Sequence, residues 1–283
     1  MPSIESEIVV VSTPGKALLF GGYLVLDRNC QGMVIAVDSR VYVAIKAVQS
    51  KTFTPNSFSI CVKSFQFTDG LWEYTVTKEN TTQNLSTINV KSKVKTPENI
   101  NPFIQTVLET SFLLIQNQSP DALSNFFDSS NTLEIVIGSD NAFYSSALRA
   151  SSLPDFSGTS LPATSKFNST GSKISAANKT GLGSSAALVS SLCASLLIFF
   201  GVVSATSFDL DFNADARNNA FEKTALDKDL VHSLAQYAHN FAQGKIGSGF
   251  DVSSAIYGSQ IYRRCTPSLF EPAMDAASAF FCL

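Results

Sequence analysis

Residues Lys179–Ala187 read KTGLGSSAA, and the uncharged segment 186–205 overlaps and extends this stretch. Two glycines one residue apart let a backbone turn tightly and come close to a bulky anion. Ser184 and Ser185 stand where a helix over 186–200 should begin, and serine is a favoured N-cap residue. The first N–H groups of a helix and the positive end of its dipole attract phosphate. This stretch therefore predicts a phosphate-binding loop, followed by two hydroxyls that are suited to ligate Mg2+.

The same stretch admits two other interpretations. A bare Gly-x-Gly is a weak motif, and it more often marks a turn before a buried helix. The segment 186–205 is also long enough to cross a bilayer, but it contains Ser190, Ser191, Ser195 and Gly201, and no basic cluster flanks it. A helix that is apolar on all sides also suits the centre of a large domain. The hydroxyls that follow the glycines favour the phosphate loop, and we expect no membrane span.

Composition and charge narrow the class of protein. The chain has 283 residues, of which 45% are hydrophobic and 15% charged, so it has ample material for a folded core. The formal net charge is −3, and no run rich in lysine and arginine occurs. We therefore expect no nucleic-acid partner, and any anionic ligand must be held by local features.

Cysteine and histidine usage argues against a disulfide framework and against a zinc site. The five cysteines are scattered without a Cys-x-x-Cys pair, and the chain has only two histidines. The first twelve residues are acidic and lack the basic start and apolar core of a secretory signal. We expect a reducing, cytoplasmic location.

Hydrophobic patterns predict a mixed α+β domain, with helices against one face of a sheet. Apolar and alternating runs predict strands over 8–12, 34–48, 58–76 with a turn at Asp69–Gly70, 133–137 and 259–264. Helical spacing and helix-start signals predict helices over 103–116, 186–200, 227–242 and 252–256. The polar segments 77–98 and 151–178 are predicted to be loops.

Two further positions attract attention beside glycines. Lys16 follows Pro14–Gly15, a break that should end the first strand, and taken alone it is best interpreted as a solvated lysine. Residues 244–249 contain three glycines, which indicates a tight turn that brings the backbone close to something. Asp251 then opens a helix, where an aspartate is most often a cap.

Three separated segments resemble, in order, the conserved segments of the GHMP kinases. They are residues 14–21, with Pro-Gly-Lys at their start, residues 181–187 and residues 247–251. Gly22–Leu26 stands where mevalonate kinases and galactokinases carry Gly-Glu-His, and the details are similar to the fungal and plant phosphomevalonate kinase subfamily. Further segments that resemble this subfamily are 101–103, 143–145, 242–251 and 257–259. The resemblance runs from about residue 8 to about residue 272.

This resemblance implies an enzyme that uses ATP and Mg2+ to convert 5-phosphomevalonate to 5-diphosphomevalonate in isoprenoid and sterol biosynthesis. Lys16 and Asp251 match the family's lysine and aspartate at the transfer site. Lys245 and Ser248 are expected to contact the small-molecule substrate, and Ser185 the metal. The family's acidic Mg2+ ligand has no carboxylate counterpart at His239–Asn240. The residues expected to bind the nucleotide are Lys179, Gly181, Leu182, Gly183, Ser184, Ser185 and Ala186.

The resemblance also implies a domain plan. Residues 1–265 should form the ATP-binding GHMP domain, of the ribosomal protein S5 domain 2-like fold. The family continues into a ferredoxin-like second domain, whereas this sequence leaves the pattern after Pro272, so residues 266–283 are expected to be a divergent tail of a truncated product with little kinase activity. Two alternatives to this kinase are an inactive nucleotide-binding fragment and another GHMP kinase such as mevalonate kinase. The oligomeric state is left open.

Overall fold

The computed structural model describes residues 8–80, 86–93, 100–145, 166–208 and 218–272. Its strands are β1 (Val9–Phe20), β2 (Gly32–Gln49), β3 (Ser57–Lys63), β4 (Leu71–Asn80), β5 (Ser86–Ser92), β6 (Asn131–Ser139) and β7 (Gln260–Tyr262). Its α-helices are α1 (Pro102–Gln118), α2 (Pro120–Asp128), α4 (Ser184–Phe199), α5 (Asn218–Gln243) and α6 (Phe250–Tyr257). A short 3-10 helix, η1 (Gly22–Leu26), follows β1.

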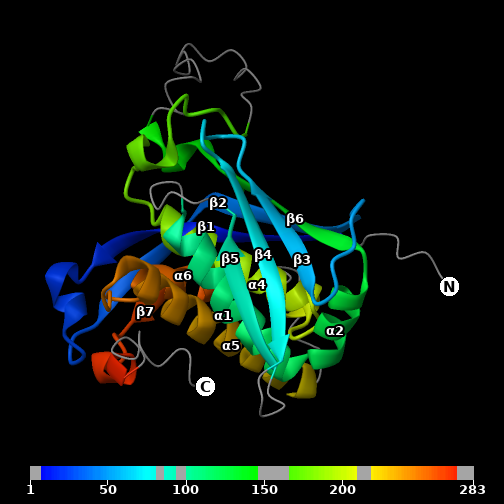
Figure 1. Ribbon diagram of the computed structural model, residues 1–283. Helices are drawn as coiled ribbons and strands as arrows, with labels where there is room; N and C mark the ends of the chain where they lie inside the picture. Colours follow the sequence, from blue (N-terminus) through cyan, green and yellow to red (C-terminus); the bar gives the residue numbers. More distant parts are fainter. Residues whose placement is uncertain (1–7, 81–85, 94–99, 146–165, 209–217, 273–283) are drawn as a thin grey trace.

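The strands form one mixed sheet in the order β1-β2-β6-β3-β4-β5, and β7 pairs with the start of β2. Among these pairs β3 and β6 run parallel, and the others run antiparallel. In β3 and β6 buried residues alternate with partly exposed ones. Because successive side chains in a strand point to opposite faces, this alternation shows that one face of the sheet is covered. Figure 1 shows α1, α4, α5 and α6 together on that side. The expected α+β class with helices on one face is confirmed.

Helix α4 lies at the centre of this helical layer. It packs against β1, β2, α1, α5 and α6, and its buried residues, Ser190, Ser191 and Ser195 among them, lie all around its axis. This position explains why the segment is uncharged on every side. Within the described residues, no helix is long and apolar enough to cross a membrane.

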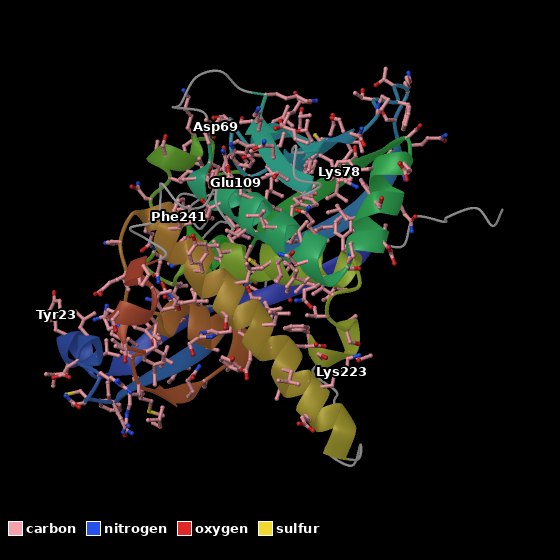
Figure 2. All side chains as sticks on the ribbon, turned by 60° about the horizontal axis from the view of Figure 1, so that its bottom comes forward. Tyr23, Asp69, Lys78, Glu109, Lys223 and Phe241 are labelled. Carbon is pink, nitrogen blue, oxygen red and sulfur yellow. The ribbon has the colours of Figure 1, made fainter. Side chains whose placement is uncertain are left out.

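Figure 2 shows how far two parts of the chain extend from the core. Tyr23, whose side chain is 92% exposed, lies at the outer tip of η1. The beginning of α5, near Lys223, runs beyond the rest of the helical layer, and its side chains from Glu222 to Leu226 are largely exposed. The remaining turns of α5 are buried against α1 and α4.

Four local expectations are corrected by the structure. Strand β1 does not stop at Pro14–Gly15 but continues through it, with a shift in its pairing with β2. Proline lacks a backbone N–H, and an edge strand such as β1 tolerates it because the N–H groups on its outer side need no partner strand. The segment 77–98 is not simply a loop, because β5 buries Ile88 and Val90 while its polar residues face outward. Helix α2 was not expected, yet it buries Leu123, Phe126 and Phe127. Ser184 and Ser185 are not caps, as described below.

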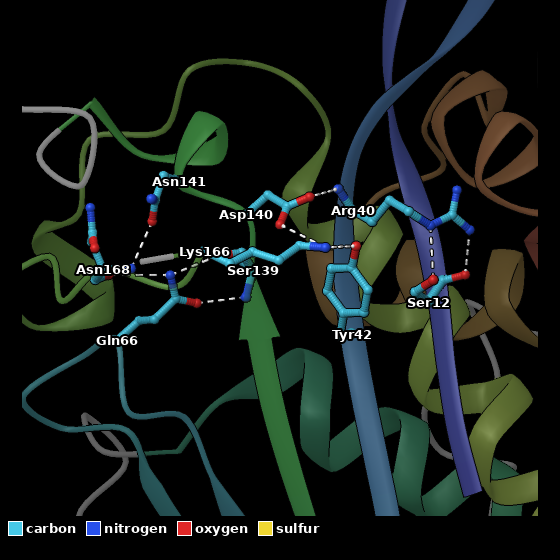
Figure 3. A network of polar contacts seen from close by, with 9 residues as sticks. All are labelled: Ser12, Arg40, Tyr42, Gln66, Ser139, Asp140, Asn141, Lys166 and Asn168. Atoms are coloured by element: carbon cyan, nitrogen blue, oxygen red, sulfur yellow. Dashed lines mark hydrogen bonds and ion pairs between the residues drawn. The ribbon is translucent and has the colours of Figure 1, made fainter. Parts of the chain in front are cut away.

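A polar network links the segment that begins at Lys166, and that leads to the glycine loop, to the open face of the sheet (Figure 3). Lys166 lies over the ring of Tyr42, at 4.2 Å from its centroid, and 3.8 Å from a carboxylate oxygen of Asp140. The side chain of Gln66 accepts from the backbone N–H of Ser139 at 2.6 Å and donates to its carbonyl oxygen at 2.8 Å. The network therefore holds the end of β6 and the chain that leads toward the glycine loop.

Candidate functional site

The glycine loop adopts the conformation that its two glycines permit. Gly181 and Gly183 have φ values of 85° and 77°, in the left-handed region that residues with a side chain rarely enter. Gly183 is the N-cap of α4, and no side chain caps this helix. Ser184 and Ser185 are therefore the first helical residues, because the tight turn is completed one residue earlier than their capping preference suggests. The N–H groups of the first turn have no intrahelical acceptor, which leaves them for an anion.

The residues just before the glycines are hydrogen-bonded to the segment 142–145, which follows β6. The hydroxyl of Thr180 donates to the carbonyl oxygen of Ala142 at 2.7 Å, and the N–H of Thr180 donates to that of Phe143 at 3.1 Å. The N–H of Ser145 donates to the carbonyl oxygen of Asn178 at 3.0 Å. These bonds fix the approach to the loop without using its glycines.

Lys16 lies directly against the same loop. Its backbone N–H donates to the carbonyl oxygen of Leu182 at 2.8 Å, and its Nζ donates to that of Gly181 at 2.9 Å. A Cβ atom on the preceding Gly15 would lie only 2.8 Å from the carbonyl oxygen of Leu182, so this approach requires glycine. The Nζ atom also lies 5.3 Å from the centroid of the Phe250 ring. Lys16 is therefore not simply a solvated lysine.

Asp251 also lies beside the loop. It lies in the first turn of α6, whose N-cap is Gly249 in the left-handed conformation. A Cβ atom placed on Gly183 would lie 3.8 Å from the Cβ of Asp251 and 3.3 Å from the Cε of Lys16. The two charged side chains thus flank one glycine, and the three separated motifs of the sequence meet at this point.

Three side chains that were not predicted to belong to the site bind the backbone of the turn before Asp251. Tyr262 donates its hydroxyl to the carbonyl oxygen of Ser248 at 2.6 Å, and Arg264 donates to that of Gly247 at 3.0 Å. On the other side, Oδ1 of the buried Asn240 accepts from the N–H of Gly247 at 3.1 Å. These contacts join residues 7, 14 and 17 positions apart. A side chain that binds a backbone group leaves no sequence motif at that group, so the structure was needed to find them.

The two serines after the glycines differ in their surroundings. Ser184 is buried, whereas Ser185 is half-buried, and its Oγ lies 3.2 Å from Nε2 of His239 on α5. Burial lowers the pKa of His239; the charge of Asp251 opposes this shift, and that of Lys179 adds to it. Both charges therefore act close to this imidazole.

The remaining predicted residues occupy less central positions. Leu182 is half-buried against the main core, and Ala186 is buried. Lys179 and Lys245 are exposed, Lys179 just before the glycine loop and Lys245 just after α5. Ser248 is half-buried and belongs to the turn that leads to Asp251. The structure thus brings Lys16, the glycine loop, Ser185 and Asp251 together, with both exposed lysines on the flanking segments.

The donor set around Ser185 fits a cation that arrives with a ligand. Within the described part of the chain, no group of three or more histidine, cysteine, aspartate or glutamate side chains could hold a metal ion. Mg2+ commonly keeps several waters and takes one or two protein oxygens together with substrate phosphates. The Ser185 hydroxyl, with Asp251 beside the neighbouring Gly183, suits that kind of partial site.

Comparisons with curated proteins find sequence relatives that are named phosphomevalonate kinases. No family model matches the chain. A phosphomevalonate kinase of Aspergillus fumigatus is 35% identical over 305 residues, covering 99% of this chain and 56% of that relative. The peroxisomal phosphomevalonate kinase of Arabidopsis thaliana is 32% identical, covering 95% of this chain and 53% of that relative. A structure of Streptococcus pneumoniae phosphomevalonate kinase in complex with phosphomevalonate and AMPPNP aligns over 94% of this chain and 53% of that chain, with 14% identity and a TM-score of 0.47.

The sequence matches cover both the glycine loop and the two flanking motifs, since they extend over nearly the whole chain. The chain is therefore a sequence relative of the fungal and plant phosphomevalonate kinases, and it spans about half the length of the curated relatives it matches.

Proposed function

We propose that this chain binds MgATP and serves an ATP-dependent kinase that phosphorylates 5-phosphomevalonate to 5-diphosphomevalonate. The observation that carries the proposal is the meeting of Lys16, the glycine loop and Asp251 around Gly183. The names of the relatives supply the acceptor, because a bare phosphate loop does not specify one. The proposal keeps residues 1–265 as the ATP-binding domain.

In this proposal the triphosphate lies against the glycine loop. The free N–H groups at the start of α4 and the helix dipole hold its oxygens. Lys16 offsets negative charge on the transferring phosphoryl group, as a well-placed donor does in phosphoryl transfer. Ser185 would hold Mg2+ together with the phosphates, and the bound ion would supply further positive charge there.

The phosphoryl transfer hardly requires a general base. An oxygen of the acceptor's phosphate forms a bond to the γ-phosphorus of ATP, the bond from that phosphorus to the β-bridging oxygen breaks, and ADP leaves. A phosphate monoester has a second pKa of about 6, so the attacking oxygen is already largely deprotonated at neutral pH. Asp251 therefore acts mainly by orienting Lys16 and the acceptor, with Lys245 and Ser248 on the acceptor side.

A second candidate is a nucleotide-binding chain without transferase activity. It is considered because His239 and Asn240, at the position of the family's acidic Mg2+ ligand, carry no carboxylate. Phosphoryl transfer depends on groups that surround and close over the phosphates.

The cytoplasmic location stays a prediction, and the Arabidopsis relative is named a peroxisomal enzyme.

One set of measurements separates these candidates. Calorimetric titration of the 283-residue chain with MgATP and with adenosine measures how much of the affinity comes from the phosphates. ADP release is then followed with 5-phosphomevalonate, with mevalonate and without an acceptor. Release that depends on 5-phosphomevalonate supports the kinase, and MgATP binding without release supports the second candidate. Release that depends on mevalonate would change the acceptor, and equal affinity for MgATP and adenosine would refute both candidates.

A further inference from the structure

His239 is the buried neighbour of the serine assigned to the metal. It lies on α5 and is 2% exposed. Its Nε2 atom lies 3.2 Å from Oγ of Ser185 and 3.1 Å from Nε2 of Gln243, one helical turn later. On its other side the ring of Phe103 lies at 5.6 Å between centroids. The imidazole thus contacts Phe103 of α1 and Gln243 of its own helix, and its hydrogen-bonding partner on α4 is Ser185.

The partners of Nε2 define the direction of these hydrogen bonds. The amide nitrogen of Gln243 can only donate, so Nε2 of His239 carries no hydrogen and accepts. An imidazole nitrogen has a single lone pair, so the hydroxyl of Ser185 and the amide of Gln243 both donate to Nε2 and share that lone pair. A serine oxygen has two lone pairs, and when its hydrogen is used in this way both stay free to accept.

We infer that His239, oriented by Gln243, is a positioning residue that holds the Ser185 hydroxyl with its oxygen available to a phosphate-bound divalent cation. This inference rests on the proposed MgATP site. The cation would then meet a fixed neutral oxygen, with its charge balanced by the phosphates and by Asp251.

Packing alone does not account for an imidazole at this position. Burying a polar ring costs free energy unless its nitrogens are hydrogen-bonded, and an apolar side chain of similar size would fill the space without that cost. Residues that orient a metal ligand, by contrast, commonly change metal affinity by about 10–100-fold when they are replaced. Both known partners of Nε2, Ser185 and Gln243, fit the second explanation.

The test uses the full chain and compares two ligands, MgATP and ATP in the presence of EDTA. His239→Ala should weaken MgATP binding by about tenfold or more and leave the affinity for metal-free ATP nearly unchanged. His239→Gln, which can still place an acceptor oxygen near Ser185, should recover most of the loss, whereas His239→Leu should not. The matched control is His232→Ala, because His232 is the chain's other histidine and lies on the same helix against Tyr257.

A double-mutant cycle with Ser185→Ala completes the test. If His239 acts through Ser185, then His239→Gln and His239→Leu should be equivalent once Ser185 is absent. The inference is overturned if the histidine variants weaken both ligands equally, if glutamine and leucine behave alike beside Ser185, or if the loss persists in the Ser185→Ala background. Failure of the proposed function looks different, because then wild-type MgATP binding itself would be absent or insensitive to Gly183→Val.

Discussion

The Nζ atom of Lys16 donates a hydrogen bond to the carbonyl oxygen of Gly181, 2.9 Å away and 165 residues later in the chain. The backbone of Lys16 is bonded to the next residue of the same loop, Leu182, at 2.8 Å. A charge that is held against a loop of free N–H groups strengthens that loop's attraction for phosphate. The relationship therefore joins the first strand and the glycine loop into one surface, which the proposed function assigns to the phosphates of ATP.

Replacing Lys16 by methionine tests this surface. The substitution keeps a long apolar side chain but removes the charge and the bond to Gly181. A hydrogen bond to a charged group contributes about 1.5–3 kcal/mol, so MgATP affinity should fall by roughly 10–100-fold, with little change in adenosine affinity. Lys173→Met, at an exposed position in the segment before the loop, is the control. Wild-type MgATP affinity in Lys16→Met, measured by calorimetry, would remove Lys16 from the site.

The two loop glycines allow backbone strain to be separated from crowding. Both have positive φ, so alanine at either position costs roughly 1–2 kcal/mol of conformational strain. A Cβ on Gly181 meets nothing within 4 Å, whereas a Cβ on Gly183 would lie 3.1 Å from Cγ of Lys16. We expect Gly183→Ala to weaken MgATP binding clearly more than Gly181→Ala, because it also displaces Lys16. Equal losses in the two titrations would mean that only the loop conformation matters.

Asp227 should be important for stability rather than for binding. This buried carboxylate accepts from the N–H of Ser204 at 2.9 Å and from the hydroxyl of Ser207 at 2.7 Å, which joins the end of the α4 region to α5. Asp227→Ala leaves both donors without their partner and should cost about 2–3 kcal/mol of unfolding free energy. Asp229→Ala loses an exposed bond to Tyr257 and should cost about 0.5 kcal/mol or less. Chemical denaturation of the two variants provides the comparison, and a similar cost would contradict it.

How much of this site was predictable differs from motif to motif. The helix after the glycine loop, and α1 beginning at Asn101, followed from apolar spacing and helix-start residues, and the Asn101 side chain does accept from the N–H groups of Phe103 and Ile104. The wrong N-cap arose because serine preference and glycine conformation compete locally, and Gly183 adopts the turn first. Strand β5 was missed because an edge strand buries only alternate residues, so its polar side dominates the composition.

The placement of Lys16 near Asp251 depends on tertiary packing and could not be predicted from local sequence patterns. Each motif alone was best explained as a solvated lysine or a helix cap. Nothing in the local pattern places both of them beside Gly183, because that depends on how β1, α4 and α6 pack. The family resemblance suggested the pairing, and the packing of these three elements supplies its physical basis. His239 was considered only for the carboxylate it lacks, since a contact between α4 and α5 leaves no signal in either sequence segment.

Glu109 on α1 provides a test of pH dependence away from the site (Figure 2). Its carboxylate accepts from Nε2 of Gln105 at 2.8 Å. Burial raises the pKa of Glu109, and the bond from Gln105 opposes that shift only in part. The negative charge also acts on two tyrosines, because burial and then Glu109 raise the pKa of Tyr74 and raise that of Tyr237 to about 12. Glu109 thus carries its charge at an unfavourable place between α1, β4 and α5.

Glu109→Gln should therefore stabilise the fold at neutral pH. Because the pKa of Glu109 is higher in the folded than in the unfolded chain, the folded state binds this proton more tightly. Its contribution to stability is then fully present below the unfolded pKa of about 4.3 and is lost as pH rises through the folded value. Glutamine keeps the oxygen that accepts from Gln105 and has no proton to lose. The stability gain of Glu109→Gln over wild type should be largest near pH 7 and should shrink as pH falls toward 4.

Glu73→Gln, at an exposed position on β4, controls for the change in net charge. Unfolding free energies measured by denaturant titration at several pH values decide the matter, since a gain that is constant with pH, or a loss at pH 7, would contradict this role for Glu109.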